Sequence, residues 1–244
     1  MTATCRAPRL AVCLLGLLLA ARCGGQAPQE QHPQPLRPPS TEKAPPEPAV
    51  SESGEPQRPK IVMLGDSLTA GLGLLESQAF PALIQQKIEA DGYRFEVENA
   101  GVSGDTSAGG LRRLDWALEG DVKVLLVALG ANDGLRGLPV SEMKRNIGDI
   151  IDRARERGVL VILAGMEAPP NFGPEYTLAF RQAYRDVALK HRVLFIPFLL
   201  NKVGGQTALN QGDGIHPNSQ GAAVVADTVW SVLRPVLDQM SASQ

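Results

Sequence analysis

The chain has 244 residues, and its 24 basic and 26 acidic side chains leave a formal charge of −2. This balance gives little electrostatic attraction for a phosphate backbone, so the composition argues against a nucleic-acid partner. A hydrophobic content of 43% is ordinary for one soluble domain with a sizeable core.

The first 23 residues have the pattern of a secretory signal peptide. Arg6 and Arg9 precede an apolar stretch at 10–21, which is too short to cross a bilayer but suits the central region of a signal. We therefore expect residues 1–23 to direct export, to the bacterial periplasm or to its membrane surface.

The cysteines support that location and open a second possibility. All of them, Cys5, Cys13 and Cys23, lie within or at the edge of the leader, so the rest of the chain can form no internal disulfide. The sequence LAARCG around Cys23 resembles a bacterial lipobox, although Arg22 stands where a small residue is expected. Two alternatives stay open: lipidation of Cys23, which would anchor the protein to a membrane, or an ordinary signal cut nearby.

Residues 24–59 are expected to form a disordered linker. The segment 26–59 contains ten prolines and no aromatic residue. Such a composition cannot bury enough apolar surface to offset the entropy lost on ordering. The folded domain is therefore predicted to occupy residues 60–240.

From Lys60 onward, strand-like apolar runs alternate with helical periodicity. The expected strands are 61–64, 95–99, 122–129, 159–164 and 193–196, and several are continuous apolar runs, as strands covered on both faces require. Apolar residues recur at helical spacing in 140–154 and in 225–236. The order predicts an α/β domain: a three-layer α/β/α sandwich with a parallel sheet of about five strands, whose ligands bind at the carboxyl ends of the strands.

Polar, glycine-rich segments stand at those carboxyl ends. They are 65–67 after the first strand, 99–106 after the second, 130–134 after the third, and 213–216 before the last helix. Each has a plain structural explanation when taken alone, as a helix cap or a turn. Together they predict a site assembled from distant parts of the sequence.

Ser67 is the candidate nucleophile of that site. A hydroxyl attacks poorly until a base removes its proton, and the chain offers three histidines as bases. His32 lies in the proline-rich tract and His191 is more typical of a helix end, whereas His216 has a carboxylate, Asp213, three residues upstream. Ser67, His216 and Asp213 are therefore the predicted catalytic residues.

The segments together resemble the SGNH, or GDSL, hydrolase superfamily. The strings are GDSLTAG at 65–71, SGDTS at 103–107, NDGLRG at 132–137 and DGIHPN at 213–218, and the resemblance spans most of 60–238. They are similar to the bacterial arylesterase, thioesterase and lysophospholipase branch. The resemblance implies a flavodoxin-like fold and a serine hydrolase that cleaves acyl esters, acyl thioesters or lysophospholipids.

The resemblance also assigns roles to particular residues. It implies an oxyanion hole made by the backbone N–H groups of Ser67 and Gly101 and by the side-chain amide of Asn132. Ala131 departs from the branch, where a second glycine often precedes the asparagine, and this departure bears on the placement of Asn132. Asp66 is expected to cap a helix.

No metal or cofactor is expected, and two other functions remain alternatives. The predicted domain has two histidines, no cysteine and no HExxH pattern, and no phosphate-binding glycine loop appears. One alternative is a polysaccharide O-deacetylase of the same superfamily. The other is a non-catalytic protein that binds lipid or glycan at the cell envelope, since fold does not dictate function.

Overall fold

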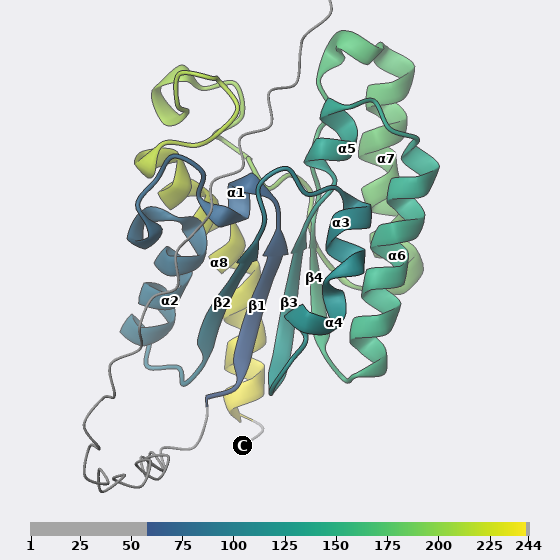
Figure 1. The fold of residues 1–244 in the computed structure, drawn as a ribbon. Coiled ribbons are helices and arrows are strands. Elements are labelled where there is room, and N and C mark those ends of the chain that lie inside the picture. The colour runs from purple at the N-terminus through teal and green to yellow at the C-terminus, as the bar shows by residue number, and fades with distance from the viewer. Residues whose placement is uncertain (1–57, 243–244) are drawn as a thin grey trace, which may run out of the picture. The chain divides into compact units, whose positions relative to one another are not determined.

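The computed structural model describes residues 58–242. It consists of a central sheet with helices on both faces (Figure 1). The predicted signal peptide, nearly all of the predicted linker and Cys23 lie outside the described residues. Within 58–242, no helix combines the length and the apolar character needed to cross a bilayer.

The sheet has five parallel strands in the order β2-β1-β3-β4-β5. Their bounds are β1 Lys60–Gly65, β2 Glu96–Gly101, β3 Val122–Ala128, β4 Leu160–Ala164 and β5 Leu194–Ile196. The predicted class, strand number and parallel arrangement are confirmed. Individual ends differ from the predicted ones by one or two residues, because backbone pairing rather than apolarity decides where a ladder stops.

The central strands are buried on both faces, as their continuous apolar sequences predict. Every residue of β1 after Lys60 is buried, and so is every residue of β3 except Lys123. The outer strand β2 carries the mixed sequence EVENAG and is mostly partly exposed. Parallel sheets require such covered central strands because helices pack on both sides.

Two groups of helices cover the sheet (Figure 1). The pair α2 (Phe80–Ala90) and α8 (Ser219–Ala242) packs on one face, whereas α3 (Ser107–Arg112), α6 (Val140–Glu156) and α7 (Pro174–His191) lie on the other. The apolar face of α6 is buried as the sequence predicts, including Met143, Ile147, Ile150, Ile151 and Ala154. The last helix ends at Ala242, two residues beyond the predicted domain boundary.

Short helical segments surround these elements. They are α1 (Ser67–Ala70), α4 (Leu114–Ala117), α5 (Ala131–Leu135), and the 3-10 turns η1 (Glu76–Gln78), η2 (Pro170–Phe172) and η3 (Thr207–Leu209). Of these, α1 follows β1 and α5 follows β3, so both begin at the carboxyl edge of the sheet (Figure 1). The strand order reverses between β1 and β3, and such a switch point is where open α/β sheets bind ligands.

Candidate active site

Ser67 is the first residue of α1, two positions after the last residue of β1. Asp66 caps this helix: its Oδ1 accepts a hydrogen bond of 3.1 Å from the N–H of Leu68, as the sequence predicts. Gly65 allows the close turn, because a Cβ at this position would lie 1.9 Å from Oγ1 of Thr69. As the first residue of a helix, Ser67 has a backbone N–H without an intrahelical acceptor.

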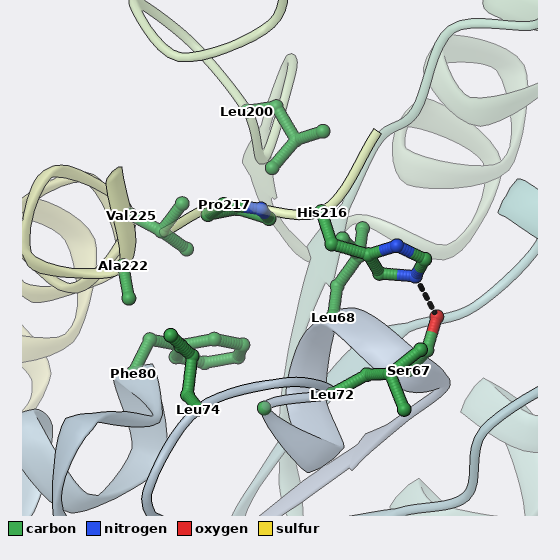
Figure 2. A pocket seen from close by; sticks show the side chains of 11 residues that line it. Ser67, Leu68, Leu72, Leu74, Phe80, Leu200, His216, Pro217, Ala222 and Val225 are labelled. Atoms are coloured by element: carbon green, nitrogen blue, oxygen red, sulfur yellow. Dashed lines mark hydrogen bonds between the residues drawn. The ribbon is translucent and has the colours of Figure 1, made fainter. Parts of the chain in front are cut away.

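The structure brings Ser67, His216 and Asp213 into one chain of contacts. The Oγ of Ser67 lies 2.9 Å from Nε2 of His216, the contact drawn as a dashed line in Figure 2. On the other side of the ring, Nδ1 of His216 lies 2.6 Å from Oδ2 of Asp213. The imidazole therefore stands between a hydroxyl and a carboxylate, the arrangement that a general base requires.

A local turn fixes Asp213 beneath the imidazole. Its Oδ1 accepts hydrogen bonds from the N–H groups of Ile215 (2.9 Å) and His216 (3.0 Å). Gly214 makes this turn with a φ of +71°, a conformation that L side chains rarely adopt. Hydrogen bonds from the backbone and ring of His216 hold the pKa of Asp213 well below its usual range, so the residue is an anion at neutral pH.

Gln211 joins the histidine segment to the nucleophile segment. Its Nε2 donates to the carbonyl oxygens of Leu72 (2.7 Å) and Pro217 (3.0 Å), which follow α1 and His216 respectively. Its backbone N–H donates to the carbonyl of His216 at 2.7 Å. Asn218 then caps α8 by accepting from the N–H of Gly221 at 3.0 Å. These contacts fix the backbone on both sides of the imidazole.

Asn132 lies in α5 and faces the nucleophile loop. Its Nδ2 donates to the carbonyl of Asp105 at 2.9 Å and lies 3.4 Å from Oδ2 of Asp66. Ala131, which stands where the family branch often has glycine, is the first residue of α5. Gly130 precedes it and has a left-handed backbone conformation. The short helix therefore forms with alanine at this position.

Gly101, the predicted backbone donor of the oxyanion hole, does not line the cleft as Ser67 and Asn132 do. Its N–H donates to Oδ1 of Asn99 at 3.0 Å, and it is not among the residues that line the cleft at Ser67. A Cβ at Gly101 would lie 2.2 Å from the backbone nitrogen of Ala70, so packing against α1 already explains the glycine. Gly104 does line the cleft, in a left-handed conformation with φ +84°.

A cleft of about 600 Å³ opens at Ser67 and His216. Its polar side chains are those of Asp66, Ser67, Ser103, Asn132, Glu167 and His216. The rest of the lining is largely apolar and includes Leu68, Leu72, Leu135, Met166, Phe198 and Leu200. This is the common composition of a ligand site, with a few polar groups to orient a mostly apolar ligand.

Apolar side chains also pack beside Ser67 and His216 (Figure 2). They enclose a hollow of only about 10 Å³, lined by Leu68, Leu74, Phe80, Pro217, Ala222 and Val225 among others. That volume is at the lower limit for one water molecule. This hollow is therefore too small to hold a substrate, in contrast to the cleft, with which it shares Ser67 and His216.

Asp66, which directly precedes Ser67, is a buried ionisable group with only 1% of its surface exposed. Burial raises its pKa from 3.8 to about 6, and the N–H of Leu68, the nearby His216 and the amide of Asn132 oppose that rise. Its carboxyl group therefore exchanges its proton close to neutral pH.

Some residues around the site carry no sequence signal of their own. Gln211 and Arg113 belong to none of the predicted segments, and only their contacts reveal them. His191 ends α7 and bonds Asp152 at 2.7 Å, which agrees with its predicted helix-end position. Among residues 58–242, no group of three His, Cys, Asp or Glu side chains is arranged to hold a metal ion.

Comparison with known proteins gives consistent matches. The model of the GDSL-like Lipase/Acylhydrolase family matches residues 63–224. Esterase TesA of Pseudomonas aeruginosa is 42% identical over 178 residues, which are 72% of this chain and 89% of that protein. The thioesterase 1/protease 1/lysophospholipase L1 of Escherichia coli K12 is 34% identical over 182 residues, covering 74% of this chain and 86% of its own.

Solved structures show the same fold. A crystal structure of TesA has a TM-score of 0.70 at 41% identity and covers 72% of this chain and 98% of its own. The psychrotrophic esterase EstA of Pseudoalteromonas, in a structure inhibited by monoethylphosphonate, also has a TM-score of 0.70. It is 32% identical and covers 73% of this chain and 98% of its own.

Proposed function

The chain belongs to the GDSL-like lipase/acylhydrolase family and is an SGNH-type hydrolase acting on ester bonds, and on this premise we propose that Ser67, His216 and Asp213 form its catalytic triad. The observation that carries the proposal is the continuous contact from Oγ of Ser67 through the ring of His216 to Asp213. It lies at the carboxyl edge of a parallel sheet and opens on a cleft.

In the proposed mechanism, Nε2 of His216 removes the hydroxyl proton as Oγ of Ser67 attacks the carbonyl carbon. Asp213 fixes the tautomer of the ring and stabilises the imidazolium that forms. Collapse of the tetrahedral intermediate returns that proton to the leaving alcohol or thiol and leaves an acyl-enzyme. A water molecule, activated by the same imidazole, then releases the acid and regenerates Ser67.

The negative charge of the intermediate requires hydrogen-bond donors. We assign the backbone N–H of Ser67 and Nδ2 of Asn132 to this role. For the third donor, the family resemblance points to Gly101, whereas the geometry favours Gly104. The N–H of Gly101 is already used by Asn99, and Gly104 lies in the cleft.

The cleft favours substrates with an acyl chain. Most of its side chains are aliphatic, and Phe198 adds an aromatic ring, so it offers more apolar contact to a hydrocarbon than hydrogen bonding to a sugar, although Ser103 and Glu167 also line it. We therefore propose carboxylic esters, acyl thioesters or lysophospholipids as substrates, in preference to acetylated polysaccharides. None of the proposed steps requires a cofactor.

A panel of esters and thioesters graded by acyl length tests this function. The protein should hydrolyse them, the preferred length should exceed two carbons, and Ser67→Ala should remove the activity. Acetate release from an acetylated glycan, measured on the same sample, should be slower. A preference for the glycan would favour the deacetylase, and no turnover of any substrate would favour a binding protein.

We further propose that the protein is exported and anchored to a membrane through Cys23. The basis is the sequence alone: an apolar leader followed by a lipobox-like cysteine. Stable anchoring takes more than one acyl chain, as a mature lipoprotein carries. Wild-type protein should fractionate with membranes, and Cys23→Ser should release it or stall its processing. A soluble wild-type protein whose mature N-terminus lies beyond Cys23 would contradict the anchor.

A further inference from the structure

Arg113 makes a set of hydrogen bonds that its position between α3 and α4 does not by itself explain. Its Nε donates to Oδ2 of Asp105 at 2.6 Å. Its two terminal nitrogens donate to backbone carbonyls, Nη1 to Ala100 at 2.7 Å and Nη2 to Gly65 at 2.8 Å. The planar guanidinium suits this arrangement because its donors form a rigid fork, which a lysine lacks.

These acceptors lie next to the catalytic machinery. Gly65 is the last residue of β1, two positions before Ser67, and Ala100 is next to last in β2. Asp105 follows Gly104 in the loop after β2. Arg113 therefore connects the strand that ends at the nucleophile with the loop that carries the favoured backbone oxyanion donor.

Asp105 extends this connection to the amide donor. Its side chain accepts from Arg113, and its backbone carbonyl accepts from Nδ2 of Asn132 at 2.9 Å. One N–H of the amide is thereby fixed. The other N–H faces Oδ2 of Asp66 at 3.4 Å, and the oxyanion role requires it to leave this long contact. A shift of the Asp105 backbone would turn the Asn132 amide away from the substrate's carbonyl oxygen, which becomes negatively charged when Ser67 attacks.

We infer that Arg113 is a positioning residue, which acts through Asp105 to hold the Asn132 amide in line with Ser67. This inference rests on the proposed oxyanion role of Asn132. The ion pair is well shielded, since the side chains of Arg113 and Asp105 are each only 17% exposed. Its loss would remove a donor from the Asp105 carboxylate and from two carbonyl oxygens, of which that of Gly65 would keep the N–H of Val102, so that the loop would rearrange around Asp105.

Arg113→Met is the direct test, with kcat, KM and melting temperature measured on the same sample. We expect kcat to fall between about 10-fold and about 100-fold, because a misplaced catalytic group costs up to about that much, while KM changes less than about threefold. Arg112→Met is the matched control, since Arg112 is the adjacent, exposed arginine, and it should keep wild-type kcat. Wild-type kcat in Arg113→Met would overturn the inference.

A double-mutant cycle separates positioning from a general role in stability. In an Asn132→Ala background the amide is absent, so Arg113→Met should lower kcat by less than about threefold further. An undiminished loss in that background would overturn the inference while leaving the oxyanion role intact. If Asn132→Ala alone kept wild-type kcat, the oxyanion role itself would fail, and the inference with it.

Asp105→Asn provides a second variant in case Arg113→Met does not fold. It retains the backbone carbonyl that Asn132 contacts and weakens only the ion pair to Arg113. Its loss of kcat should be smaller than that of Arg113→Met, and it should likewise disappear in the Asn132→Ala background. A loss of kcat that persists there would have the same meaning as for Arg113→Met.

Discussion

The hydroxyl oxygen of Ser67 lies 2.9 Å from Nε2 of His216, although 149 positions separate the two residues in the sequence. The fold closes this distance because Ser67 follows β1 and His216 precedes α8, which packs on the sheet. Gln211 supports the same closure with separate hydrogen bonds to Leu72 and Pro217. The proposed nucleophile is thus paired with its proposed base before any substrate binds.

This pairing predicts a single reactive serine. A fluorophosphonate should label Ser67, and Ser67→Ala should abolish both labelling and ester hydrolysis. Ser103→Ala is the matched control, since Ser103 lines the same cleft, and this variant should label at the wild-type rate. Mapping of the label to Ser103 by peptide mass spectrometry would show that the nucleophile is assigned wrongly.

Asp213→Asn should uncouple the base from its orienting group. An amide NH₂ in place of Oδ2 would favour a tautomer with the proton on Nε2, which cannot accept the proton of Ser67. By analogy with the serine protease triad, kcat should fall by up to about 10⁴-fold. The rate of fluorophosphonate labelling should fall in parallel.

Asp227→Asn is the control for removing a carboxylate. Asp227 lies on α8 and pairs with Lys87 at 2.7 Å, outside the cleft. This variant should keep wild-type kcat and labelling rate. If Asp213→Asn kept them as well, Asp213 would have no part in orienting the base.

The titration of Asp66 should appear in the pH dependence of stability. Burial raises its pKa from 3.8 to about 6 in the folded protein. Between about pH 4 and pH 6 the folded state therefore holds a proton that the unfolded chain has lost, and this group makes the free energy of unfolding fall as pH rises. A shift of about two units corresponds to about 3 kcal/mol.

Comparison with Asp66→Asn isolates that contribution. Denaturant unfolding of both proteins from pH 4 to pH 7 gives the difference between their free energies of unfolding at each pH. As pH rises, the free energy of unfolding of the wild type should fall by about 2 to 3 kcal/mol relative to that of Asp66→Asn. The low pKa of Asp213 acts in the opposite direction, but it is present in both proteins and cancels. If the free energies of unfolding of the two proteins changed in parallel with pH, the pKa of Asp66 would not be raised by burial.

Much of this site could be predicted from the sequence because its chemistry sits in contiguous strings. Continuous apolar runs identified buried parallel strands, and strand ends placed Ser67 and Asn132 at one edge. The His216 and Asp213 pair is held by a local turn, so a spacing of three residues was sufficient to find it.

Other features depend on contacts that no local pattern encodes. Arg113 is held by carbonyl oxygens of β1 and β2, which any residues in those strands would supply. Gly101 and Gly104 lie three positions apart, at the end of β2 and in the loop after it, and only the fold shows which of them lines the cleft. Packing against Ala70 is a sufficient reason for Gly101, and sequence alone cannot separate it from a catalytic reason.

The structure of a phosphonate adduct would decide between the two glycines. With a phosphonyl group on Ser67, its anionic oxygen should lie about 2.7 to 3.1 Å from Nδ2 of Asn132 and from the backbone nitrogen of Gly104. The N–H of Gly101 should remain on Oδ1 of Asn99. An adduct in which Gly101 leaves Asn99 and reaches the phosphonyl oxygen would restore the family-based assignment.

Asn132→Ala tests whether the side-chain amide of Asn132 is a donor of the oxyanion hole. If Nδ2 stabilises the developing oxyanion, the interaction strengthens in the transition state, so kcat should fall about 100- to 1000-fold while KM changes far less. Asn146→Ala is the control: Asn146 donates to Oγ of Ser107 at 3.0 Å within the scaffold, outside the cleft. It should lower the melting temperature with little effect on kcat, the reverse of the result for Asn132→Ala. An Asn132→Ala variant that melts normally and keeps near-wild-type kcat would leave Ser67 and a glycine N–H as the remaining proposed donors.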